Sequence, residues 1–257
     1  MSQIILPARI SRRRMLGVAA GSALSVVVSQ SLPGCAADAA TAAAGTASDS
    51  TATTTSPACV LTAALTEGPY FVDERLYRSD IRTDPVTGDV SAGVPLGLQF
   101  NVIRVEGGAC TPLTGVYLDV WHANALGAYS DEQALGTSGE KFLRGYQITD
   151  AAGVVQFTTI YPGWYRGRAV HIHFKLRLFA GATTSYEFTS QFFFDDSLTD
   201  VVHALSPYNG RGTRDTRNGS DSIYTSLSSS QRAALTLQAT SSGSGYSGVI
   251  NLGVQVG

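Results

Sequence analysis

Charged side chains are scarce in this chain of 257 residues: they make up 15% of the total, and their signs nearly cancel to a net charge of −2. Arg9, Arg12, Arg13 and Arg14 lie within residues 1–34, which contain no acidic residue. Removal of these four from the 18 basic residues leaves 14 against 20 acidic ones, a net charge of −6. The rest of the protein therefore lacks a basic surface, and neither nucleic acid nor an anionic membrane is expected as a partner.

The chain also lacks an apolar run long enough for a stable membrane span, because the run from Leu16 to Val28 is short and diluted by glycine and serine. This run follows the sequence Ser11-Arg12-Arg13-Arg14-Met15-Leu16, which resembles a twin-arginine export signal. Residues 1–34 are therefore predicted to be a signal segment. Twin-arginine export carries folded proteins, often with a cofactor already inserted, which fits a metalloenzyme.

Cysteine is rare, with three residues in the chain. Cys35 ends the sequence Leu32-Pro33-Gly34-Cys35, which resembles a lipobox. The mature protein is then either a lipoprotein anchored to a membrane at Cys35 or a cleaved, secreted protein. Both alternatives predict export to the periplasm, the cell envelope or the medium. Cys59 and Cys110 would remain in an oxidising compartment, and we expect them to form a disulfide.

Residues 35–58 consist almost entirely of Ala, Thr, Ser, Gly and Asp. This composition cannot bury a core and predicts a flexible tether between the signal and the folded part. The folded domain is expected to cover residues 59–257. The hydrophobic content of the chain, 44%, is enough for one sizeable core.

No long helical period is present from Gly97 onward, where short stretches rich in Val, Ile, Phe, Tyr and Thr alternate apolar with polar residues. The predicted strands are residues 96–106, 114–123, 153–160, 170–179 and 185–194. Glycine-containing turns separate them. A short helix over 228–235 and a final hairpin over 235–256 complete the expectation of an all-β fold, a single β-sandwich with long loops.

Histidine is also sparse, and two of the four histidines lie in one tripeptide, His171-Ile172-His173. Side chains two apart on a strand point to the same face, so His171 and His173 would present both imidazoles together. Pro162 and Gly163 break the preceding strand, and the loop over 164–168 can fold Tyr165 back over that face. Three potential metal ligands would then lie close together.

A second tyrosine follows the predicted strand that ends in Trp121. The alternation stops after this residue, so a loop is expected over 121–131. Gly127 allows a sharp turn that can carry Tyr129 from the end of the strand toward the histidines.

Together these stretches resemble the intradiol ring-cleavage dioxygenases, the family of protocatechuate 3,4-dioxygenase and catechol 1,2-dioxygenase, over roughly residues 59–194. The family motifs appear here in order as Thr66-Glu67-Gly68-Pro69-Tyr70, Trp121 with Gly127-Ala128-Tyr129, Pro162-Gly163-Trp164-Tyr165, and Arg168-Ala169-Val170-His171-Ile172-His173. The short stretch between Tyr165 and His171 is similar to that of the exported branch of the family and should open the pocket.

The resemblance implies a non-haem ferric ion bound by Tyr129, Tyr165, His171 and His173. Phenolates are hard anionic donors that favour Fe(III), and a bound cation lowers the tyrosine pKa. The implied activity is intradiol cleavage of a catechol-type aromatic diol by O2 to a cis,cis-muconate-type diacid.

The resemblance also implies roles for residues around the ion. Tyr165 would be the axial ligand that the substrate displaces, and Arg168 would stabilise developing negative charge. Pro69, Tyr70, Arg168 and Gln191 are the implied substrate contacts. His122 and His203 match no ligand position and are expected to be structural or surface residues.

Two other functions stay open on the residues alone. One is an exported, non-catalytic β-sandwich binding module, and the other is an enzyme with copper or zinc at the same histidines and tyrosines. A homo-oligomer is also possible, although the chain lacks the N-terminal helical dimerisation region of the catechol 1,2-dioxygenases.

Overall fold

The computed structural model describes residues 59–256. The predicted signal (1–34) and tether (35–58), with Cys35, lie outside the described residues. None of the helices between residues 59 and 256 is both long enough and apolar enough to span a membrane. Residues 59–256 form two β-sheets with few helices, which confirms the predicted all-β class.

The first sheet is built around the long strand β1. Its members are β2 (Ala109–Pro112), β1 (Pro95–Glu106), β10 (Gly245–Val254), β9 (Thr240–Ser242) and β5 (Val154–Ile160). Strand β1 pairs in parallel with β10 and antiparallel with β2 and β5. The predicted C-terminal hairpin is present as β9 and β10, which pair antiparallel.

The second sheet carries the strands that end at the candidate site. Its order is β4 (Arg144–Ile148), β3 (Tyr117–Trp121), β6 (His171–Ala180), β7 (Thr183–Phe194) and β8 (Thr236–Leu237). The pairs β3–β4, β3–β6 and β6–β7 are antiparallel. The five strands predicted from alternation all form, and β4 in this sheet and β2 in the first sheet are additional strands that were not predicted.

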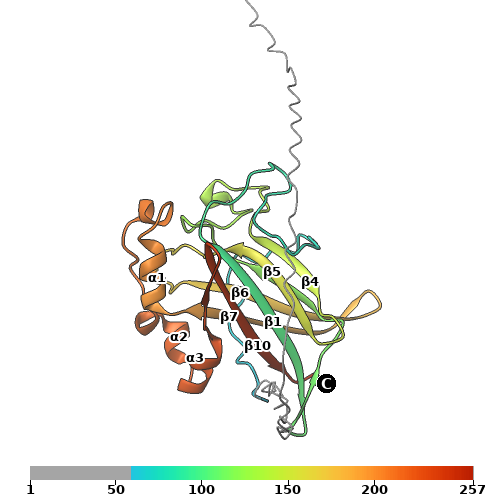
Figure 1. Cartoon of the computed structure of the whole chain (residues 1–257). Helices are drawn as coiled ribbons and strands as arrows, with labels where there is room; N and C mark the ends of the chain where they lie inside the picture. Colours follow the sequence, from blue (N-terminus) through green and yellow to red (C-terminus); the bar gives the residue numbers. More distant parts are fainter. Residues whose placement is uncertain (1–58, 257) are drawn as a thin grey trace, which may run out of the picture. The chain divides into compact units, whose positions relative to one another are not determined.

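The two sheets pack as layers, with β1 and β10 in front of β6 and β7 in Figure 1. Phe100 on β1 lies at the centre of the core, fully buried, with its ring centroid 6.0 Å from that of Phe174 on β6 and 5.9 Å from that of Phe192 on β7. Truncation of such a buried phenylalanine to alanine typically costs about 3–5 kcal/mol. Alternation along β6 sends Ile172 and Phe174 into this core and the histidines to the opposite face.

That opposite face of the second sheet is covered by the segment before β1. Lys175, two residues beyond His173, is buried under Phe71, with its ammonium nitrogen 3.9 Å from the ring centroid, and it pairs with Glu67. Further along β6, Arg177 bonds to Asp119 on β3. The covering segment therefore turns an otherwise exposed sheet face into an interior in which polar side chains are held by partners.

Three short helices, α1 (Asp196–His203), α2 (Ser222–Ser226) and α3 (Ser229–Leu235), lie together beside the strands in Figure 1. Single turns of 3₁₀-helix occur at Gln133–Leu135, Tyr208–Arg211 and Asn218–Ser220. The predicted helix near residues 228–235 is α3, which begins with Ser228 and Gln231 capping each other's backbone N–H groups. The sequence analysis did not predict helices α1 and α2, which have eight and five residues.

The predicted disulfide between Cys59 and Cys110 is present, with the two Cα atoms 5.7 Å apart. Cys110 lies on β2, at the edge of the first sheet. The start of the described chain is therefore tied covalently to the sandwich, as the sequence analysis expected.

Candidate metal centre

His171 and His173 are the first and third residues of strand β6. Both are buried, with 3% and 1% of their surface exposed. Their Nε2 atoms lie 3.1 Å apart. The Nδ1 atom of His171 lies 2.6 Å from the carbonyl oxygen of Ala169. A carbonyl can only accept, so Nδ1 carries the proton and the lone pair of His171 Nε2 points toward His173.

Tyr165 reaches the histidines from the loop between β5 and β6, as predicted. Its Oη atom is 3.1 Å from Nε2 of His171. The side chain is partly exposed, whereas both imidazoles are buried. Of the three groups, the phenol of Tyr165 is therefore the one that lies nearest to solvent.

Tyr129 approaches from the other side, on the loop after β3. Its ring centroid is 5.7 Å from that of Tyr165 and 6.2 Å from that of His173. The residue is 1% exposed, and its Oη atom finds no hydrogen-bond partner within residues 59–256. A buried hydroxyl without a partner is costly, so this oxygen indicates a missing ligand.

The loops that carry the two tyrosines touch each other through glycines. Gly127 has a φ of +81°, and a Cβ atom there would lie 2.1 Å from the carbonyl oxygen of Trp164. A Cβ on Gly163 would lie 2.3 Å from the carbonyl oxygen of Ala125. The backbone N–H of Gly163 also donates to Asn124, at 3.0 Å. Only residues without a side chain allow this approach, which fixes the spacing between the loops.

The segment before β1 covers the donors with an aromatic ring. The ring of Tyr70 stacks on that of Tyr129, with centroids 4.3 Å apart and planes at 22°. It also meets the edge of Tyr165, at a centroid distance of 6.2 Å. Pro69, beside it, is exposed. The structure thus brings Tyr70 to the site and places Pro69 at its outer rim.

Arg168 and Gln191 are joined to each other next to the histidines. Nη2 of Arg168 donates to Oε1 of Gln191 at 2.6 Å, and Nε2 of Gln191 donates to the carbonyl oxygen of Thr66 at 2.8 Å. Gln191 lies opposite His173 in the pairing of β6 with β7, and it is fully buried. Nε of Arg168 donates to Asp221 at 2.9 Å.

Sequence reasoning missed three residues that support this group. Asp221 accepts from Arg168, as above. Arg144, 3% exposed, donates to the carbonyl oxygens of Tyr70 and Ser130, both at 2.6 Å, and so ties the cover to the loop of Tyr129. Trp121, although noted as a motif residue, was given no role; its ring lies parallel to that of His173, with centroids 4.9 Å apart. Arg144 and Asp221 lie far from the motifs in sequence, and their side chains carry no local signal.

Burial controls the protonation of the four donors. Burial, and next the charge of Arg168, lowers the pKa of His171 to about 3, and burial and then His171 lower the pKa of His173 well below its ordinary value. Burial, with Tyr165 nearby, raises the pKa of Tyr129 well above its ordinary value. Burial also raises the pKa of Tyr165, although Arg168 acts in the opposite direction. Without a cation the imidazoles are neutral and the phenols protonated.

These donors fit a metal ion. Neutral imidazole is ready to ligate, and a bound cation supplies the positive charge that ionises a phenol in a dry site. A single cation would also give the lone pair of His171, the facing nitrogen of His173 and the orphaned oxygen of Tyr129 a common partner. In the part of the chain that the structure describes, no three His, Cys, Asp or Glu side chains gather into a metal site. The tyrosines are therefore needed to complete the donor set, and imidazole with anionic oxygen suits iron.

The other two histidines lie outside this group, as expected. His122 is buried and structural, with Nε2 2.7 Å from the hydroxyl of Thr159. His203, at the end of α1, has Nε2 3.1 Å from the carbonyl oxygen of Pro162. Burial lowers the pKa of His122 to about 4, so its ring is neutral.

Comparisons with known proteins identify the family to which this β-sandwich, with its His/Tyr donor group, belongs. Residues 66–208, more than half of the chain, match the family model described as Dioxygenase. The chain belongs to the intradiol ring-cleavage dioxygenase family, whose members are oxidoreductases that typically use non-haem iron.

Two solved structures are similar over most of the described chain. The intradiol ring-cleavage dioxygenase from Tetranychus urticae has 28% identity and a TM-score of 0.64, and the alignment covers 77% of this chain and 95% of that one. The dioxygenase domain of a dioxygenase–carbohydrate-binding protein fusion from the cellulolytic bacterium Streptomyces sp. SirexAA-E has 30% identity and a TM-score of 0.55. That alignment covers 77% of this chain and 100% of that domain.

Catechol 1,2-dioxygenase 1 from Acinetobacter lwoffii is 27% identical over 144 residues, which are 49% of this chain and 44% of that enzyme. The match thus spans less than half of the length of this curated relative.

Proposed function

We propose that the chain is an intradiol dioxygenase that cleaves the ring of a catechol-type aromatic diol with O2 to give a cis,cis-muconate-type diacid. The observation that carries this proposal is the convergence of two phenols and two imidazoles, with Tyr165 Oη and His173 Nε2 each 3.1 Å from His171 Nε2 and Tyr129 Oη buried beside them. Family membership supports it, because the substrates of this family are catechol-type aromatics and O2. The similarity to a catechol 1,2-dioxygenase favours the same substrate class.

Tyr129, Tyr165, His171 and His173 would hold a ferric ion. When bound, this ion supplies the Lewis acidity and the redox chemistry that make an aromatic diol reactive toward O2. The protein keeps the donors in place from behind: the carbonyl of Ala169 sets the tautomer of His171, and Trp121 stacks on His173.

Among the four groups that would hold the metal ion, Tyr165 is the one best placed to take a proton from the substrate. A diol hydroxyl must lose its proton on entering the site, and Tyr165 is partly exposed whereas Tyr129 is buried. Tyr129 is packed between Tyr70 and the loop behind it and cannot move in the same way. We therefore assign Tyr165, in the phenolate form that a bound cation would produce, as the group that takes up the proton, and Tyr129 as the metal ligand that stays in place.

Arg168 and Gln191 would stabilise the negative charge that develops on the substrate. The guanidinium is positive and oriented before substrate arrives, because Gln191 and Asp221 already bond to it. A fixed cation in a water-poor pocket acts far more strongly than one in bulk water. Gln191 is itself held by Thr66, so its amide cannot rotate freely.

Tyr70 and Pro69 would contact the aromatic ring of the substrate. The ring of Tyr70 covers Tyr129 and meets the edge of Tyr165, so it forms an apolar wall beside the donors. Pro69, the exposed neighbour of Tyr70 in the chain, would contact the part of the ring that lies nearest to solvent. The short connection between Tyr165 and His171 would leave this side of the site more open to the substrate.

Iron loading of the purified protein tests the proposal. The expected result is about one iron per chain by elemental analysis, a red-brown colour from ferric tyrosinate absorption, and O2 uptake with loss of ring absorbance in a panel of catechols. A zinc-loaded protein would be colourless, and a binding module would hold no metal. Iron-free, colourless protein after reconstitution, or iron-loaded protein that consumes no O2 with any catechol, would overturn the proposal.

We further propose that the protein is exported and acts in the periplasm, at the cell envelope or outside the cell. The disulfide between Cys59 and Cys110 supports this location, because such bonds persist in oxidising compartments. Cell fractionation with a C-terminal epitope tag tests it, and a lysine pair in place of Arg12 and Arg13 should keep the protein in the cytoplasm. Recovery of the unaltered protein in the cytoplasm would contradict export.

A further inference from the structure

Asp221 uses its two carboxylate oxygens for two different tasks. The residue is fully buried. Oδ1 accepts from the backbone N–H groups of Ile223, at 2.7 Å, and Tyr224, at 2.9 Å, and so caps helix α2. Oδ2 accepts from Nε of Arg168, at 2.9 Å, and from the backbone N–H of Ala169, at 2.8 Å. One side chain thus joins the helical region to the residues that precede His171.

The guanidinium of Arg168 is held at two of its three nitrogens. Nε bonds to Asp221, and Nη2 bonds to Gln191 at 2.6 Å. Among the described residues Nη1 makes no hydrogen bond, so it is the nitrogen left to face a ligand. The orientation of Nη1 therefore depends on Asp221 and Gln191, which hold the other two nitrogens of the guanidinium.

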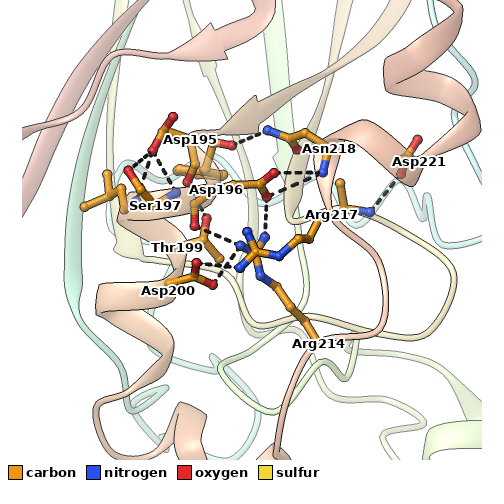
Figure 2. A network of polar contacts seen from close by, with 12 residues as sticks. Asp195, Asp196, Ser197, Thr199, Asp200, Arg214, Arg217, Asn218 and Asp221 are labelled. Carbon is orange, nitrogen blue, oxygen red and sulfur yellow. Dashed lines mark hydrogen bonds and ion pairs between the residues drawn. The ribbon is translucent and has the colours of Figure 1, made fainter.

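The segment that precedes Asp221 is held by a network of ion pairs, shown in Figure 2. Arg214 lies with its side chain 5% exposed and donates to Asp196, at 2.5 Å, and to Asp200, at 2.9 Å. Arg217 donates to Asp200 as well, at 2.5 Å. These bonds tie the segment that leads to Asp221 onto helix α1, so the carboxylate has little freedom to follow a moving arginine.

The same segment holds the loop of Tyr165 at other points. The indole N–H of Trp164 donates to the carbonyl oxygen of Gly212 at 3.2 Å, and Nε of Arg211 donates to the carbonyl oxygen of Trp164 at 3.1 Å. The backbone N–H of Gly167 donates to Asp215 at 3.1 Å. Asp221 and Asp215 lie beyond residue 208, where the match to the family model ends.

We propose that Asp221 is a positioning residue for the reaction, which acts through Arg168 by aiming the guanidinium at the substrate. This inference rests on the proposed function. The carboxylate fixes Nε before substrate binds, so the stabilisation of developing charge needs no rearrangement of the arginine during the reaction. Loss of Oδ2 as an acceptor leaves the guanidinium of Arg168 held by Gln191 alone, so its orientation is less restricted.

The variant Asp221→Asn separates the two tasks. Asparagine caps a helix as well as aspartate does, through its remaining oxygen, but its amide nitrogen cannot accept from Arg168 or Ala169. We expect kcat/KM to fall by about 10- to 100-fold, mostly through kcat, with iron content unchanged. The matched control is Asp195→Asn, because Asp195 caps α1 through the N–H groups of Ser197 and Leu198. The control should stay within about twofold of the wild type.

A double-mutant cycle shows whether Asp221 acts through the arginine. If it does, Asp221→Asn combined with Arg168→Gln should be no more than about twofold slower than Arg168→Gln alone. Effects that multiply, or an Asp221→Asn protein that is as active as Asp195→Asn, would overturn the proposal.

A measurement on metal-free protein separates this inference from the proposed function. The Nε–H signal of Arg168 in an NMR spectrum, assigned by its loss in Arg168→Gln, should exchange slowly with solvent in the wild type and quickly in Asp221→Asn. Failure to cleave any catechol would refute the proposed reaction. If the Nε–H of Arg168 still exchanges more slowly in the wild type than in Asp221→Asn, the positioning of Arg168 by Asp221 would stand. Equal exchange in the two proteins would refute the aiming itself.

Discussion

Gly127 and Trp164 are in backbone contact: a Cβ atom added to Gly127 would stand 2.1 Å from the carbonyl oxygen of Trp164. The loop that carries Tyr129 therefore packs directly against the loop that carries Tyr165. A contact between main chains therefore restricts the distance between the two phenols.

Replacement of Gly127 by alanine should force the two loops apart. The φ of +81° adds strain to the steric conflict, and together they should lower the free energy of unfolding by more than about 2 kcal/mol and weaken iron retention. Gly139→Ala is the matched control, since Gly139 has a φ of +80° but no atom within 4 Å of the added Cβ. Urea unfolding compares the two variants. Equal losses of stability would mean that the contact with Trp164 is unimportant.

His171→Ala should abolish iron binding, because it removes the nitrogen that lies 3.1 Å from both Tyr165 and His173. Iron per folded chain, measured by elemental analysis after reconstitution, should fall to background. His203→Gln changes a histidine outside the donor group and should keep the wild-type iron content. Full catechol cleavage by His171→Ala would rule out the assigned metal centre.

Tyr165→Phe removes the proposed proton acceptor while three donors remain. Part of the iron should be retained, with altered visible absorption, and kcat should fall by about 10²- to 10⁴-fold, the usual range for a lost acid–base group. Tyr77→Phe, an exposed tyrosine outside the site, serves as the control. Unchanged kcat in Tyr165→Phe would place the proton acceptor elsewhere.

The ionised carboxylate of Asp84 is expected to stabilise the fold in a pH-dependent way. Burial alone would raise the pKa of this carboxyl, but the backbone N–H groups of Lys141, Val86 and Thr87 outweigh burial and lower it. The lowered pKa means that this stabilisation is complete above the unfolded-state value near 3.8 and is lost as pH falls through the folded-state value.

Asp84→Asn should therefore destabilise the protein by about 1–3 kcal/mol at pH 7. The difference from wild type should shrink as pH falls below about 4. Urea unfolding at a series of pH values measures both effects, and Asp89→Asn, an exposed residue of the same turn, should have little influence. A difference that stays constant down to pH 2.5 would contradict the role of the ionised carboxylate.

Removal of the disulfide by Cys59→Ser with Cys110→Ser should lower the free energy of unfolding by about 2–4 kcal/mol, since the bond closes a long loop. The two cysteines are 51 residues apart in sequence. A reducing agent should lower the melting temperature of the wild type to that of the double variant and leave the double variant unchanged. Insensitivity of the wild type to reduction would show that the bond contributes little.

The sequence predicted most of the fold because strand alternation is a local signal. The five strands expected from alternation form the centre of the sandwich, and His171 and His173 share a face because they are two apart on β6. Tyr165 and Tyr129 were placed correctly because Pro162-Gly163 and Gly127 mark the turns that carry them. Strand β4 was missed because Arg144-Gly145-Tyr146 does not read as an alternating apolar stretch.

The residues that orient the site were harder to predict, because their positions depend on tertiary packing. Asp221 follows His171 by fifty residues and reaches Arg168 only after helices α1 and α2 have packed beside the strands. Arg144 is buried, against the usual preference of arginine for the surface, and only the fold reveals its carbonyl partners on Tyr70 and Ser130. An isolated arginine or aspartate in a sequence cannot signal such a contact.

The bond between Cys59 and Cys110 also has a mechanical consequence. The bond joins Cys59 to Cys110 on strand β2, so the start of the described chain is held by the first sheet as well as by its own backbone. Tyr70, whose ring stacks on that of Tyr129, lies inside the loop that this bond closes. The segment that covers the tyrosines therefore starts from a point fixed to the sheet, which restricts how far it can move away from them.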